Sequence, residues 1–439
     1  MKTPTPRRLL RYVTRCLRLG RYLADPGDGR PQPQIPARVL LWALILGRLL
    51  REPSFHGVEQ LVRSAACRAL GVYQSFGDDA LSYFTERLDP ARARAALIDT
   101  LHRAKRNKAF HNSAFLGLAM DGTSAGRSST QGCALCRPQC NAKKEVIGYN
   151  HQLATISVVG TGLSLPFDAE PYGPGDSEYA AGQRLLIRAV SQLGVRFADY
   201  LVVDGEYATA PFLHIAGSVG VHVVARLKSN LPELFRAVGK RFDASPPTRV
   251  YREREQRIEI WDADDFDPWQ TLQWHTVRVI RYRQHKPDGS VVEADWLTDF
   301  PSRQVSSLSL YHMAKSRWEI ENQGFNEAKN RYGLEHICHH QANSVLISWL
   351  LSLFAMVIER LYRLRYLHRG KHPVHSAEQL CRLLWLSVSR PLAPNNSCHG
   401  SGSPIFFSLR HRHPFCSAPP AASTGNHSQK IGRPSRFYF

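Results

Sequence analysis

The sequence has few acidic residues for its length. Its 439 residues include 57 lysines and arginines but only 37 aspartates and glutamates, which leaves a formal net charge of +20. A field of that size favours polyanionic partners over neutral or acidic ones. Nine cysteines are too few for a secreted disulfide scaffold. A hydrophobic content of 43% excludes a wholly disordered basic protein.

The sequence also lacks a convincing export signal or membrane span. Residues 1–24 carry seven basic residues and no acidic one, but no apolar core follows them before the polar stretch Asp25–Gln34. Gln341–Ile358 is uncharged for 18 residues, long enough to span a bilayer, but only Val345–Ile358 is densely apolar. We therefore expect a buried core helix there. The absence of an export signal predicts a bacterial, cytoplasmic, nucleoid-associated protein whose default partner is nucleic acid.

The first part of the chain, residues 1–110, has a helical pattern. Ser54, Asp78 and Asp89-Pro90 precede amphipathic stretches and indicate helix starts, and the last helix ends in the basic stretch 102–108. Basic helical faces suit phosphate contacts, so the region is a candidate DNA-binding domain. The alternative is a solvated helical cap with no role in DNA binding.

The rest of the chain divides into four parts. Short apolar runs that alternate with turns and helices predict a mixed α/β sheet over residues 111–232. Two-residue alternation over 233–304 predicts a β-rich insertion, and helical periodicity resumes over 305–390 with a break near 331–333. From 391 to 439 the chain has five basic residues, no acidic one and no periodic apolar face, which predicts a disordered tail.

Two of the expected strands end in Asp-Gly. Asp121 follows the apolar run Phe115–Met120, and Asp204 follows Tyr200–Val203. A carboxylate at the carboxyl end of a sheet strand is held rigidly while the loop beyond it stays open to solvent. Asp-Gly is also ordinary turn chemistry. Two such carboxylates in a basic protein nevertheless suit divalent cations that bind phosphate oxygens.

A helix expected over Lys315–Tyr332 supplies a third carboxylate. Arg317 and Glu321 are four residues apart and share one helix face, and Lys329 follows about two turns later. An arginine beside a metal-binding carboxylate can orient it and bind phosphate, and the lysine can hold a DNA backbone. An exposed helix with ordinary ion pairs would show the same residues.

The order of these motifs resembles the DDE transposases of bacterial insertion sequences, in particular the group with a Tyr-x2-Arg-x3-Glu-x6-Lys signature. The resemblance covers about residues 35–370 and implies an RNase H-like catalytic fold. It also implies that Asp121, Asp204 and Glu321 hold two Mg²⁺ or Mn²⁺ ions. Two positions depart from the signature: Ala314 stands where the tyrosine is expected, and Lys329 comes one residue late.

Other residues compete for, or add to, this site. Glu319 lies about 200° around an α-helix from Glu321, and Glu327 about 120° away, so neither shares its face. We therefore favour Glu321. Arg226 and Lys228, at the end of the strand expected over Val221–Leu227, join Arg317 and Lys329 as candidate phosphate ligands.

Three of the nine cysteines lie within eight residues. Cys133, Cys136 and Cys140 follow the first aspartate, and His151 comes eleven residues later. C-x2-C is zinc-ligand spacing, and Cys140 with His151 could complete a tetrahedral site. The alternative is three reduced cysteines in a loop.

These features together predict a cut-and-paste DNA transposase that acts on double-stranded DNA at terminal repeats and at a target. The resemblance implies a homodimer or a larger synaptic complex. One alternative is a transposase-derived DNA-binding protein or repressor that has lost catalysis. Another is a metal-dependent nuclease without strand transfer.

Overall fold

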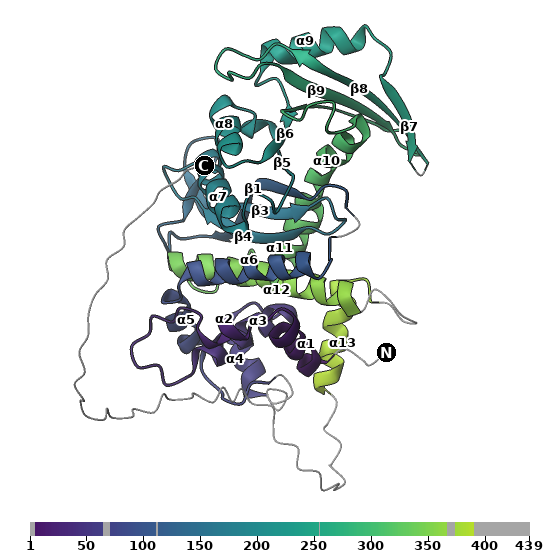
Figure 1. Ribbon diagram of the computed structural model, residues 1–439. Helices are drawn as coiled ribbons and strands as arrows, with labels where there is room; N and C mark the ends of the chain where they lie inside the picture. The colour runs from purple at the N-terminus through teal and green to yellow at the C-terminus, as the bar shows by residue number, and fades with distance from the viewer. Residues whose placement is uncertain (1–4, 65–70, 111–112, 254, 367–373, 390–439) are drawn as a thin grey trace, which may run out of the picture. The chain divides into compact units, whose positions relative to one another are not determined.

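The first described elements are helices, some of which begin at a polar side chain that caps them. The computed structural model describes residues 5–64, 71–110, 113–253, 255–366 and 374–389 (Figure 1). The Ser54 hydroxyl accepts a 2.9 Å hydrogen bond from the Gly57 N–H, and Asp89 caps a helix whose first residue is Pro90. Such caps satisfy backbone donors that a helix leaves free. The elements are α1 (Pro6–Arg11), the π-helical η1 (Tyr12–Cys16), α2 (Gly20–Ala24), α3 (Ala37–Leu49), α4 (Phe55–Arg63), α5 (Asp78–Glu86) and α6 (Pro90–Arg106).

A mixed sheet forms the centre of the middle part of the chain. Strands β1, β5 and β6 are parallel, whereas β3 runs antiparallel between β1 and β4. The order β4-β3-β1-β5-β6 is the RNase H-like arrangement, as expected. The elements are β1 (Gly117–Ser128), β2 (Arg137–Cys140), β3 (Val146–Val159), β4 (Leu165–Pro171), α7 (Glu178–Leu193), β5 (Tyr200–Val203), η2 (Gly205–Tyr207), α8 (Ala210–Ser218) and β6 (His222–Leu227).

The two faces of this sheet bury different side chains because successive strand residues point in opposite directions. Met120 and Val203 lie in one apolar cluster with residues of α7 and α8. Ala119 and Val202 lie in a second cluster with residues of α10 (Ser307–Glu319). Helix α10 packs along the β1, β5 and β6 part of the sheet (Figure 1). Residues two positions beyond Ala119 and Val202 therefore point toward the α10 side.

The segment predicted as a β-rich insertion continues the same sheet. Strand β10 pairs antiparallel with β6, and the full order is β2-β3-β1-β5-β6-β10-β9-β8-β7. The segment also begins with a helix, which the alternation did not predict. Local alternation indicates that a strand exists but not which strand it pairs with. The elements are α9 (Pro232–Asp243), β7 (Arg249–Glu253), β8 (Gln256–Phe266), β9 (Val277–His285) and β10 (Val291–Thr298).

The long apolar helix near the carboxyl end is a core helix, as predicted. The remaining elements are the π-helical η3 (Ile320–Phe325), α11 (Asn326–Tyr332), α12 (Ala342–Tyr366) and α13 (Ala377–Ser389). Helix α12 is long and apolar enough to cross a membrane, but 94% of its most apolar stretch is buried inside the protein. It packs against β4 and against α3, α5 and α6, and it lies between the sheet and α3 (Figure 1).

Polar contacts join the amino-terminal helices to α12. The Arg48 guanidinium, which is 1% exposed, donates to the hydroxyls of Ser348 and Ser352. The Asn343 amide donates to three carbonyls at the end of α5, among them that of Leu88 at 2.8 Å. The amino-terminal helices therefore share one continuous core with α12 and the sheet. The tail predicted for 391–439 lies outside the described residues.

Candidate active site

The sheet register brings the two predicted aspartates to equivalent positions. Gly117, Leu118 and Ala119 of β1 pair in parallel with Tyr200, Leu201 and Val202 of β5. Asp121 and Asp204 each lie two residues beyond the last pair. Because side chains alternate along a strand, both carboxylates point to the face that α10 covers.

Arg317 connects Asp121 to Glu321. Its guanidinium donates a 3.0 Å hydrogen bond to Asp121 Oδ2 and forms an ion pair with Glu321 Oε1 at 2.8 Å. The positive charge of Arg317 also acts on the pKa of Asp204. The predicted carboxylates, which lie far apart in the sequence, thus gather around one arginine.

Glu321 lies in the π-helical turn η3, which follows α10 directly. The Asn326 N–H donates to the Glu321 carbonyl, five residues back, where an α-helix would bond four residues back. A π turn therefore takes up one residue more than an α turn. The spacing between Glu321 and Lys329, one residue longer than in the signature, contains this π turn. Lys329 forms a 3.3 Å ion pair with Glu335.

Asp204 has its own basic partner. The Lys228 ammonium lies 2.7 Å from Asp204 Oδ2 and is half exposed. Burial would raise the pKa of Asp204, but the Lys228 contact, the Gly205 N–H and the charge of Arg317 together hold it below its ordinary value. The guanidinium of Arg226, also predicted to bind phosphate, lies over the Trp296 ring, 5.5 Å from the centroid.

The surroundings of Asp121 disfavour its charged form. Burial raises the pKa of Asp121 from 3.8 to about 7, and the charges of Glu178 and Glu321 add to the rise against the opposing effect of Arg317. A carboxylate pushed toward protonation by its surroundings is a common property of functional sites. A bound cation would favour its ionised form.

A fourth carboxylate, Glu178, lies beside the site and was not predicted from the sequence. It is the first residue of α7, and its side chain lies directly against Gly122, where an added Cβ would come within 2.0 Å of Oε2. It accepts hydrogen bonds from the hydroxyls of Tyr172, at 3.3 Å, and Tyr207, at 3.2 Å. Burial raises its pKa despite these bonds. No local pattern marked it, because it contacts the site only through the fold.

The two competing glutamates lie elsewhere. Glu319 accepts a 3.1 Å hydrogen bond from the Gly160 N–H in the turn between β3 and β4. Glu327 pairs with Arg360 at 2.9 Å. Both carboxylates are therefore engaged in structural contacts away from Asp121. The nearest tyrosine of the signature region, Tyr311, is buried against Tyr282.

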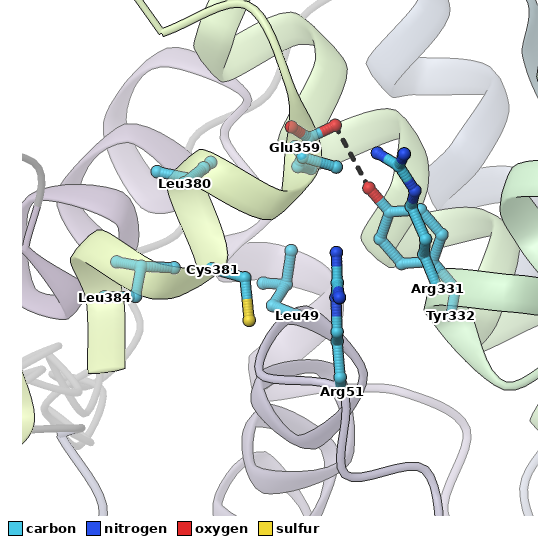
Figure 2. Close-up of a pocket in the computed structure, with 9 residues that line it drawn as sticks. Leu49, Arg51, Arg331, Tyr332, Glu359, Leu380, Cys381 and Leu384 are labelled. Atoms are coloured by element: carbon cyan, nitrogen blue, oxygen red, sulfur yellow. Dashed lines mark hydrogen bonds between the residues drawn. The ribbon is translucent and has the colours of Figure 1, made fainter. Parts of the chain in front are cut away.

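A small pocket lies apart from these carboxylates (Figure 2). It is lined by residues of α11, α12 and α13 and of the end of α3 and the chain just beyond it, and includes Glu359, which accepts a 3.0 Å hydrogen bond from Tyr332. Glu359 also pairs with Arg363. Its carboxylate is thus satisfied within the core, which argues for a structural role.

Two of the three clustered cysteines lie in a compact group of possible metal ligands, and this group differs by one residue from the predicted set. Cys133, Cys136, His151 and His340 each offer a ligand atom within 4.8 Å of the others. Cys140 is not in this group: it is exposed at the far end of β2 and pairs with Val146. The spacing of three cysteines therefore did not identify the fourth member, which comes from the chain after α11.

Comparison with known proteins identifies the family. The family model described as "Transposase DDE domain" matches residues 113–358, which is more than half of the chain. The protein therefore belongs to this family of DDE transposases. It is also similar to a piggyBac transposase in the cryo-EM structure of a synaptic complex with hairpin DNA. The TM-score is 0.45 and the identity 10%, over 88% of this chain and 80% of that one. No curated relative matches the sequence.

The residues of the site suit a divalent cation. Asp121, Asp204 and Glu321 offer only carboxylate oxygens, the donors that Mg²⁺ and Mn²⁺ prefer. Burial, with the charges of Glu178 and Glu321, raises the pKa of Asp121, and a bound cation would favour its ionised form.

The strain at Asp121 predicts a stability effect that depends on pH. In metal-free buffer, folding holds the Asp121 pKa near 7 against an ordinary 3.8, so the folded state binds the proton more tightly. Stability should therefore fall as pH rises from about 4 to about 7 and then level off. Asp121→Asn has no titrating group at this position and so lacks this loss of stability. As the pH rises over the same range, the melting temperature of the variant should therefore increase relative to that of the wild type.

Thermal melts in chelator at several pH values test this expectation. Added Mg²⁺ should then stabilise the wild type more than Asp121→Asn, because the variant loses an anionic ligand. Parallel pH curves for the two proteins would contradict the assignment of the strain to Asp121.

Proposed function

We propose that this DDE transposase cleaves DNA at the ends of a mobile element and joins the freed ends to target DNA. The observation that supports this best is the convergence of Asp121, Asp204 and Glu321 around Arg317. Two divalent cations held by these carboxylates would activate the attacking oxygen and stabilise the leaving oxygen. The same site would serve water in the first step and a 3′-hydroxyl in the second.

The basic residues of the site can interact both with the carboxylates and with a DNA phosphate. Arg317 and Lys228 hold the carboxylates in place and carry the charge that a phosphate needs. Arg317 is the more deeply placed of the two, with 12% of its side chain exposed against 50% for Lys228. We therefore infer that Arg317 positions the carboxylates and that Lys228 contacts the DNA backbone. Lys329 and Arg226 would extend this contact.

The amino-terminal helices supply a second basic surface. Residues 5–24 contain no acid, and five of their arginines are exposed: Arg7, Arg11, Arg15, Arg18 and Arg21. Such a surface binds phosphates without reading sequence, and its affinity falls steeply with salt. We propose that it binds double-stranded DNA in a bacterial cytoplasm, within an assembly of two or more chains that holds two ends.

Incubation with DNA that carries the element's own ends, an unrelated plasmid and Mg²⁺ tests the proposal. We expect cleavage at the ends and end-to-plasmid junctions, both of which should disappear in chelator. Sequencing all products separates the alternatives. Cleaved ends without junctions would indicate a nuclease, and binding without cleavage would indicate a repressor.

A further inference from the structure

A second metal site is formed by residues that take no part in the carboxylate cluster. Cys133 Sγ lies 3.7 Å from Cys136 Sγ and 3.1 Å from His151 Nε2, and Cys136 Sγ lies 3.5 Å from the same nitrogen. Tetrahedral zinc with ordinary bond lengths places two sulfurs about 3.8 Å apart and a sulfur and a nitrogen about 3.5 Å apart. The measured separations are close to these values.

The local backbone explains how the two sulfurs meet. The Cys136 N–H donates to the Cys133 carbonyl at 3.1 Å, which closes the tight turn of a C-x2-C pair. Cys136 and His151 are fully buried, and the ring of Trp349 lies edge-on to His151 with centroids 6.3 Å apart. Cys136 and His151 are therefore shielded from water, while Cys133 and His340 are partly exposed.

The fourth residue approaches from the other side of the fold. The rings of His340 and His151 lie 5.7 Å apart. The Nδ1 atom of His340 is buried and has no hydrogen-bond partner among the described residues. The ring packs on Gly132, where an added Cβ would come within 2.6 Å of it. A buried ring nitrogen without a partner is costly unless a ligand satisfies it.

We propose that Cys133, Cys136, His151 and His340 bind one structural zinc ion. Two thiolates and two imidazoles are a frequent zinc set, whereas Mg²⁺ prefers the carboxylate site. The ion would join the base of the β2–β3 hairpin to the segment between α11 and α12. Strand β1 leads from Asp121 toward this hairpin, and η3 and α11 lead from Glu321 to His340. The zinc would thus fix the separation of two carboxylate-bearing segments.

Metal analysis of the full-length protein, purified without a histidine tag or chelator, tests the proposal directly. We expect about one zinc per chain. Cys136→Ser and His340→Ala should each lower this content several-fold. The matched controls Cys140→Ser and His339→Ala should leave it unchanged, because Cys140 is exposed and His339 pairs with Glu86.

Cobalt substitution gives a second measurement that needs no variant. Co²⁺ in the site should show the visible bands of a tetrahedral ion and a thiolate charge-transfer band, and Zn²⁺ should displace both. Less than about a tenth of an equivalent of zinc, or equal loss in Cys140→Ser and Cys136→Ser, would overturn the proposal. An oxidised Cys133–Cys136 pair in thiol counting would do the same. None of these readouts depends on DNA cleavage.

Discussion

Glu321→Gln should reduce DNA cleavage and strand transfer by roughly 10³-fold or more, the scale seen when one member of a cooperative catalytic set is removed. Glutamine keeps the shape and one oxygen but loses the charge that binds a cation. Asp121→Asn and Asp204→Asn should have the same effect. Binding to the element's ends should remain, because the phosphate contacts come from basic residues elsewhere.

Glu319→Gln is the matched control for this prediction. It lies two residues away along the same helical run, is half-buried, and accepts a hydrogen bond from the Gly160 N–H, which a glutamine oxygen can also accept. It should cut DNA at close to the wild-type rate. An inactive Glu319→Gln beside an active Glu321→Gln would move the assignment to the other glutamate. Full activity in both would exclude this helix from the chemistry.

The parts of the site that depend on local patterns could be predicted from the sequence. Asp121 and Asp204 were marked by apolar strands that end in Asp-Gly, and parallel strands place such ends at one edge. Glu321 was marked by its i,i+4 relation to Arg317. Lys329 comes one residue later than in the signature, and the intervening segment contains the π turn of η3, which the sequence pattern did not predict.

Contacts between distant segments could not be predicted in this way. His340 follows His151 by 340 − 151 = 189 residues, so no spacing rule joins them. Cys140 fitted the rule, but the backbone of β2 carries it away from the other cysteines and into solvent. Glu178 and the pairing of β10 with β6 likewise depend on how the elements pack.

The buried Arg360 holds the π turn in place, and Arg360→Leu should lower the free energy of unfolding by about 3–5 kcal/mol, the usual cost of removing one partner from a buried ion pair. Arg360 is 2% exposed. It donates to the carbonyls of Ser164 and Gln323 and to the Glu327 carboxylate. Leucine would leave these acceptors without their donor in the core. The expected loss is measurable by denaturant unfolding.

Arg365→Leu on the same helix is the control, because Arg365 is exposed and its loss should change stability by less than about 0.5 kcal/mol. Adding Glu327→Gln to Arg360→Leu should recover part of the loss, since the double variant no longer has an unpaired carboxylate. A coupling of about 0.5–3 kcal/mol is expected from the double-mutant cycle. If Arg360→Leu were as mild as Arg365→Leu, η3 would be held by its own backbone. The π turn between Glu321 and Lys329 would then not depend on Arg360 of α12.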